Sequence, residues 1–155
     1  MVEDRREETA AERADRNWTD LLQEVRVLQT GVQLLSGFLL TLPFMPRFDR
    51  LDDVQVALYL TLVVLAAATT LVLLGAVALH RRFFQEQRKE SLVQVGHRLA
   101  QVALALGAAL ALGATVFVLD VVLTRAVAAW VGASMVAIGV GAWALLTHAV
   151  LTAPD

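Results

Sequence analysis

The stretch from residue 26 to residue 46, RVLQTGVQLLSGFLLTLPFMP, decides how the rest of the chain is interpreted. It is apolar and long enough to cross a bilayer, yet it carries two glutamines and three hydroxyl side chains. Three further runs follow, over residues 54–79, 99–119 and 126–151; they contain no Asp, Glu, Lys or Arg, and their only histidine is His148. A run of about 18 or more such residues is typical of a membrane helix. Together with residues 27–45, they predict four membrane spans.

The composition agrees with a small membrane protein. The chain has 155 residues, of which 57% are hydrophobic, against roughly 45–50% in an average soluble domain. This length suits one domain, which we place at residues 9–151, after a disordered segment at 1–8. Cysteine is absent, which excludes disulfides, thiolate metal sites and cysteine catalysis.

The basic residues predict the orientation of the four spans. Ten of the 13 Lys and Arg residues lie before the first span or between the second and third spans, and three lie in the other two connections. Because positive charge collects on the cytoplasmic side, both termini are expected in the cytoplasm. The expected location is a bacterial cytoplasmic (inner) membrane, crossed several times.

The first helix is predicted to be longer than its span. A capping-box pattern begins at Thr9, and the helix meets no strong stop signal before Pro43. Residues 10–26 would then form a cytoplasmic extension. A 3.5-residue apolar period marks a seam along this helix, formed by Trp18, Leu21, Val25, Leu28, Val32, Leu35, Leu39 and Leu42. The seam packs either within the chain's own bundle or, as an assembly seam, against another copy.

The polar side chains of the first span form a separate stripe. Gln29, Gln33, Gly37 and Thr41 are spaced by four residues, and the positions beside them are Arg26 and Ser36. Such groups in lipid usually face protein and hydrogen-bond neighbouring helices. The alternative is a hydrated path for ions along this face.

Asp120 is the acidic residue with the strongest case for a role. It follows 21 uncharged residues and precedes Val121, at the end of the third span, where a carboxylate is costly unless it is paired or protonated. Arg125 is the nearest positive charge in sequence, and Arg47 and Arg50 are further candidates. The expected role is an ion pair that locks the turn; the alternative is a titrating group that gates ion entry.

No pattern of a catalytic site is present. The sequence has no Gly-rich phosphate loop, no serine elbow and no metal-binding helix motif, so we expect no enzyme activity, cofactor or metal. His80, His97 and His148 invite a metal or haem interpretation, but interfacial side chains with hydrated tips explain them as well.

Three segments resemble a family of small actinobacterial membrane proteins of unknown function. They are NWTDLLQEVRVLQTGVQLLSGFLLTLPF (17–44), HRRFFQEQRKESLV (80–93) and FVLDVVL (117–123). The resemblance covers nearly the whole chain after residue 9 and implies a four-helix membrane fold. Some members of that family carry an automatic label of sodium:proton antiporter. Ion-coupled carriers typically place a carboxylate within the membrane and interrupt a helix around the ion, and neither feature is found in mid-span here.

The sequence therefore predicts an all-α four-transmembrane-helix bundle with both termini inside. The expected function is a non-enzymatic membrane protein that assembles with itself or serves as an accessory subunit of a membrane complex. The alternative is a small oligomeric channel or a proton/cation transporter. The expected partners are the lipid bilayer and either another copy or another membrane protein, and no nucleic acid.

Overall fold

The computed structural model describes the backbone of residues 10–83 and 89–152, and the side chains of residue 16 and of residues 19–78 and 95–152. Across these residues the chain is all-helical. Its elements are α1 (Ala10–Thr41), η1 (Leu42–Phe44), η2 (Phe48–Arg50), α2 (Asp53–Phe83), α3 (Lys89–Val122) and α4 (Arg125–Thr152). The predicted disordered segment 1–8 lies outside the described residues.

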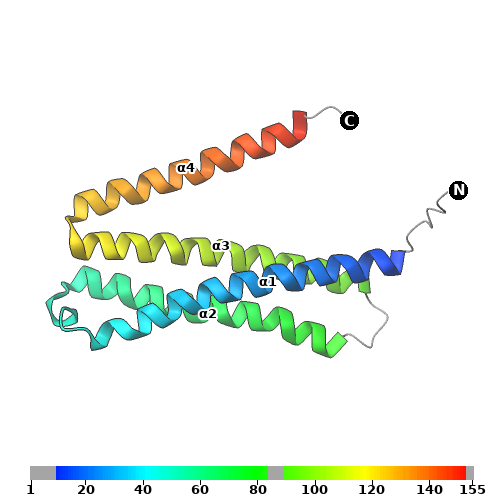
Figure 1. The fold of residues 1–155 in the computed structure, drawn as a ribbon, viewed down its shortest axis with the longest axis horizontal. Helices are drawn as coiled ribbons and strands as arrows, with labels where there is room; N and C mark the ends of the chain where they lie inside the picture. The colour runs from blue at the N-terminus through cyan, green and yellow to red at the C-terminus, as the bar shows by residue number, and fades with distance from the viewer. Residues whose placement is uncertain (1–9, 84–88, 153–155) are drawn as a thin grey trace, which may run out of the picture.

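Each of the four long helices contains a segment long and apolar enough to cross a membrane. These segments are Thr19–Phe44, Asp53–Ala78, Val95–Val122 and Arg125–Thr152. The four helices predicted from hydropathy are thus present. At one end of the molecule, here called the loop end, lie the α1–α2 and α3–α4 turns; α1 begins and α4 ends at the opposite end, the terminal end (Figure 1).

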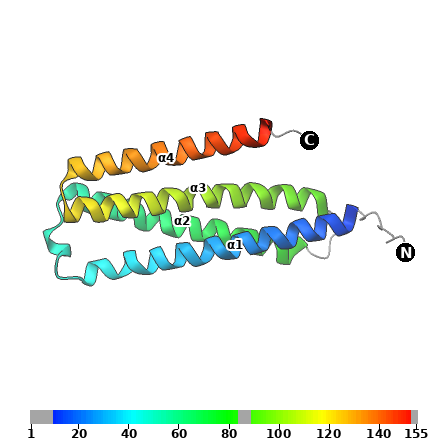
Figure 2. The same ribbon diagram turned by 45° about the horizontal axis from the view of Figure 1, so that its top comes forward.

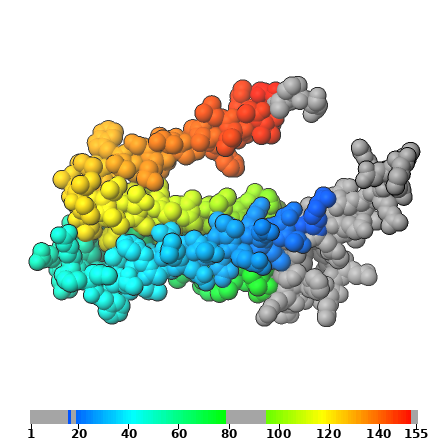
Figure 3. Space-filling view, in the orientation of Figure 1, coloured from blue at the N-terminus to red at the C-terminus, as the bar shows by residue number. Residues whose placement is uncertain are grey.

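The four helices do not form a closed bundle. Helices α1, α2 and α3 pack against one another, whereas α4 contacts α3 and no other described helix. Figures 1 and 2 both show α4 close to α3 at the loop end and separated from it at the terminal end. The space-filling view shows a notch between α4 and the other three helices (Figure 3).

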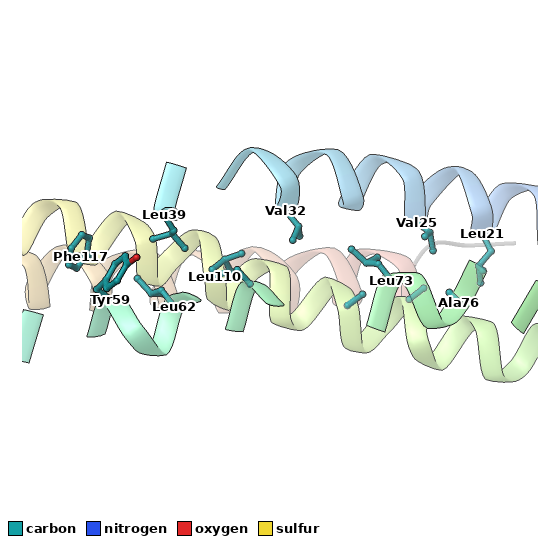
Figure 4. Close-up of a cluster of buried hydrophobic side chains, with 13 residues drawn as sticks. Leu21, Val25, Val32, Leu39, Tyr59, Leu62, Leu73, Ala76, Leu110 and Phe117 are labelled. Carbon is teal, nitrogen blue, oxygen red and sulfur yellow. The ribbon is translucent and has the colours of Figure 1, made fainter. Parts of the chain in front are cut away.

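The core follows the apolar seam of α1. Leu21, Val25, Val32 and Leu39 are buried, and the intervening seam residues Leu28, Leu35 and Leu42 are partly buried against the same cluster. Their neighbours come from α2 and α3 and include Leu62, Leu73, Leu110 and Phe117 (Figure 4). The seam is therefore closed within one protomer, which does not support an intermolecular coiled coil along it. The side chain of Trp18 lies outside the described residues.

Small residues allow the helices to approach closely. Gly107 faces Val32 of α1, and a Cβ built on Gly113 would lie 2.5 Å from Cδ2 of Leu62 in α2. Ala128 and Gly132 are the buried residues of α4, and a Cβ on Gly132 would lie 2.8 Å from Val116 in α3. Close backbone approach at small residues is how helices gain packing energy in lipid.

The two-residue turn between α3 and α4 places α4 beside α3. Thr124 precedes the first residue of α4, and its hydroxyl accepts a 3.5 Å hydrogen bond from the Val127 amide, as expected of an N-cap. Beyond Gly132, the next positions on the same side of α4 are Met135 and Val136, and both are exposed. From Ala133 to Thr152 every residue of α4 is exposed, so the contact is limited to the loop end.

Gly113 and Gly31 provide a matched test of this packing. Gly113→Ala should destabilise the protein by about 1–3 kcal/mol because buried Leu62 must move. Gly31→Ala, on the exposed face of α1 with nothing within 4 Å of the new Cβ, should be neutral or stabilise the helix by up to about 1 kcal/mol. The measurement is the thermal unfolding midpoint of the purified variants in mild detergent. Equal midpoints for the two variants would contradict the α2–α3 contact.

Candidate functional site

A cluster of polar side chains joins the elements at the loop end. Asp52 begins this cluster as the N-cap of α2. Its Oδ1 accepts hydrogen bonds from the Val54 and Gln55 amides, both at 3.0 Å. In return, the Gln55 Oε1 accepts a 3.1 Å bond from the Asp52 amide. This reciprocal pair is a capping box, and the second carboxylate oxygen of Asp52 takes no part in it.

Arg125, the first residue of α4, bridges two carboxylates. Its Nη2 lies 2.6 Å from Oδ2 of Asp52, and its Nε lies 3.3 Å from Oδ1 of Asp120. The Asp120 side chain is 6% exposed, whereas those of Arg125 and Asp52 are each 54% exposed. The predicted Asp120–Arg125 pair is therefore present. Arg47 and Arg50 make no ion pair with Asp120 among the described residues.

Gln55 adds a contact between α2 and α3. Its Nε2 donates a 3.2 Å hydrogen bond to the backbone carbonyl of Asp120. One side chain thus caps its own helix and binds the end of α3. Sequence reasoning missed Gln55 and the Asp52–Arg125 bridge. The D-x-x-Q spacing was the available sequence signal for the capping box. No sequence signal was available for the Asp52–Arg125 bridge, because it joins residues 73 positions apart.

The environment of Asp52 favours its ionised form. Its pKa is lowered from 3.8, chiefly by the hydrogen bond from the Gln55 amide; burial opposes this effect, and the hydrogen bond and charge of Arg125 lower the pKa further. A carboxyl group whose pKa falls on folding contributes stability that is complete above its ordinary pKa. That contribution is lost as the pH falls through the folded-state value. At neutral pH the Arg125 bridge is therefore intact.

Aromatic side chains support the same end of the molecule. Phe48 of η2 packs edge-on against Tyr59 of α2, with ring centroids 5.1 Å apart. Tyr59 in turn lies 6.2 Å from Phe117 of α3, and both of these residues are buried. The α1–α2 connection is thus docked on the helices instead of standing free.

The glutamine stripe of α1 does not lie between the helices of the protomer. Gln33, Gly37 and Thr41 are exposed, and Gln29 and Ser36 are partly buried. The hydroxyls of Ser36 and Thr41 bond to carbonyls of their own helix, those of Val32 and Phe38. Within the described residues, neither glutamine side chain hydrogen-bonds a neighbouring helix. The structure thus leaves most of the stripe facing outward, together with exposed Arg26.

The histidines are not brought together as a metal site. His97 and His148 are exposed, on α3 and α4, and the side chain of His80 lies outside the described residues. The described part of the chain contains no group of three His, Cys, Asp or Glu side chains placed to hold a metal ion. A feature that sequence reasoning missed is Thr69, which is fully buried and bonds to the Leu65 carbonyl of its own helix.

The arrangement as a whole fits a small membrane protein made of four apolar helices. The chain belongs to DUF6328, a family of unknown function, which matches residues 7–147. No curated protein and no solved structure matches the chain. The polar cluster at the loop end, defined by Asp52, Gln55, Asp120 and Arg125, combines ion pairs, caps and an interhelix bond, and these are the contacts of a structural clamp.

The clamp predicts a measurable coupling between Asp120 and Arg125. Asp120→Asn should lower stability by about 1–3 kcal/mol, because the hydrogen bond from Arg125 loses its ionised acceptor in a partly buried position. The double variant Asp120→Asn/Arg125→Gln should be more stable than the sum of the two single losses implies. Thermal unfolding in detergent measures both quantities. Asp49→Asn, which removes an exposed carboxylate of η2, is the control and should change the stability little. Strict additivity of the stability losses of the Asp120 and Arg125 variants would refute the clamp.

Proposed function

We propose that this protein is a non-enzymatic integral membrane protein that assembles with further copies of itself through α4. The observation that supports the proposal is the isolation of α4: α3 is the only described helix that packs against it, and it is exposed from Ala133 onward. In a bilayer, a helix gains packing energy only where another helix approaches it. A second copy supplies the neighbour that the protomer does not.

The outward face of α4 has the character of a packing surface. At 100° per residue, Ala137 and Gly141 lie on the side of α4 opposite Ala128 and Gly132. Ala137 and Gly141 form a small-xxx-small pair, and Ser134 lies on the same side. A Cβ on Gly141 would meet nothing within 4 Å in the protomer. Small residues on a lipid-exposed face let a second helix approach closely.

The proposed location is a bacterial cytoplasmic membrane, with both termini in the cytoplasm. The distribution of basic residues supports this orientation, because ten of the 13 Lys and Arg residues precede the first span or lie between the second and third spans in sequence. The loop end, with the clamp of Asp52, Asp120 and Arg125, then lies on the side of the membrane opposite the cytoplasm. Another membrane protein in place of a second copy would make the chain an accessory subunit.

Cysteine cross-linking tests the self-assembly directly, because the natural chain contains no cysteine. Single variants Ala137→Cys and Gly141→Cys should form disulfide-linked dimers in native membranes under mild oxidation. Gly141→Leu should shift the purified protein toward the monomer in mild detergent while leaving its helical content unchanged. Gel electrophoresis and light scattering are the respective measurements.

The control for collisional cross-linking is Leu71→Cys. Leu71 is 69% exposed on α2 and lies at a depth along the helices similar to that of Gly141. The Leu71→Cys protein should remain monomeric under the same oxidation. Equal cross-linking at Leu71 and Gly141, or a monomeric wild-type protein in membranes, would overturn the proposal.

A small oligomeric channel or proton/cation transporter is the second candidate. The observation that favours it is the exposed polar stripe, since Gln33 and Thr41 face away from the protomer's own helices. In lipid such groups are costly, whereas copies arranged around them can enclose water.

The variant Gln29→Leu/Gln33→Leu separates the two candidates. Under the assembly proposal, liposomes that contain wild-type protein show no more proton or potassium flux than empty liposomes. The double variant should then retain the oligomeric state of the wild type. If wild-type protein does carry a flux, and the double variant abolishes it without dissociating, transport becomes the better account.

A further inference from the structure

The divergence of α4 leaves a groove near the terminal end. It has a volume of about 550 Å³ and lies between α1, α3 and α4, on the side of the notch in Figure 3. The residues used below are Glu24 and Leu28 of α1, His97, Gln101 and Leu104 of α3, and Trp143 of α4. The groove belongs neither to the clamp at the loop end nor to the outward face of α4.

The position of the groove along the helices corresponds to a membrane boundary. Gln101 precedes the last residue of α3, Val122, by 21 positions, or about 31 Å at about 1.5 Å per residue. The hydrocarbon layer is about 30 Å thick. If the loop end lies at one boundary, the groove lies at the other. Trp143 suits this depth, because tryptophan is enriched at membrane interfaces.

Glu24 provides the charge of the groove. Among the described residues its carboxylate has no ion pair and no hydrogen bond, so its full acceptor capacity is available. Its surroundings are largely apolar and include Leu28, Ala100 and Leu104. Glu24 is exposed at the groove, so a cation can pair with its carboxylate while the cation's own apolar groups cover the apolar lining.

Trp143 adds a second element of cation recognition. Its side chain lines the groove and is 73% exposed, so its aromatic face is accessible to a ligand. Indole is the best of the natural side chains for cation–π contact. Gln101 also lines the groove and contributes an amide that can orient a polar group.

We propose that this groove binds an amphiphilic organic cation, with the charge near Glu24 and the apolar substituents between Leu28, Leu104 and Trp143. The proposal goes beyond self-assembly and does not depend on it. An inorganic cation suits the groove less well, because one carboxylate with apolar walls cannot replace its hydration shell. A phosphate group would be repelled by the Glu24 carboxylate, and the described lining contains no Lys or Arg side chain to offset that repulsion.

Equilibrium dialysis with tetraphenylphosphonium tests the proposal on the full chain in dodecyl maltoside, with protein-free micelles as the blank. We expect saturable binding of one cation per protomer. Glu24→Gln should weaken it at least about 10-fold, and Trp143→Leu by about 3- to 10-fold. Circular dichroism of each variant checks that its helical content is unchanged.

Matched controls separate the groove from general attraction to the protein. Asp49→Asn removes the same charge from the exposed loop end, and Trp130→Leu removes the other exposed tryptophan of α4, which is 76% exposed. Both variants should bind like the wild type. The monomeric variant Gly141→Leu should also bind, which distinguishes failure of this proposal from failure of self-assembly.

Four results would overturn the proposal. One is the absence of saturable binding, and another is an equal loss in Asp49→Asn and Glu24→Gln. The third is equally strong binding of neutral triphenylphosphine oxide, which would indicate apolar partitioning alone. The fourth is complete displacement of the probe by phosphatidylethanolamine, which would make a lipid headgroup the natural occupant.

Discussion

The leucine and valine side chains of α1 fill the space between α2 and α3, and the positions of the other elements follow from that contact. Leu21, Val25, Val32 and Leu39 are buried in sequence order along the whole contact. Helices in lipid have no water to exclude from between them, so their association depends on close packing. Once three helices share this core, the fourth can lie only outside it. Helix α4 therefore has one neighbour where a closed bundle would provide two.

The loop end holds α4 in this peripheral position. A two-residue turn and the bridge of Arg125 to Asp120 and Asp52 tie the start of α4 to α3 and to the start of α2. The bridge is partly exposed, and surface ion pairs contribute little stability by themselves. Here, however, it is combined with the capping box of α2 and the Gln55–Asp120 bond. Together these contacts fix the start of α4 against the end of α3 and the start of α2.

Because of this geometry, we propose a different role for each of two faces of α4. The side that carries Ala137 and Gly141 points away from the molecule and offers a surface for another copy. The side that carries Trp143 overlooks the groove with Glu24 and Leu104. A helix packed along its full length against α1 and α3 would have neither surface available. The partial detachment of α4 is thus the feature from which both proposals arise.

The sequence by itself determined the number of helices, the continuous α1 from residue 10 to residue 41, and the apolar seam, because uncharged runs and helical periods are local properties of the chain. It also predicted the Asp120–Arg125 pair, because Arg125 is the nearest positive charge in sequence, although Arg47 and Arg50 were further candidates. Only the tertiary structure placed the glutamine stripe on the outward side of α1. It likewise showed that α4 leaves α3 after Gly132 and that Glu24, Gln101 and Trp143 line one groove. The physical reason is that periodicity identifies which residues share a helix face, whereas the neighbour of each face depends on how side chains far apart in sequence fit together.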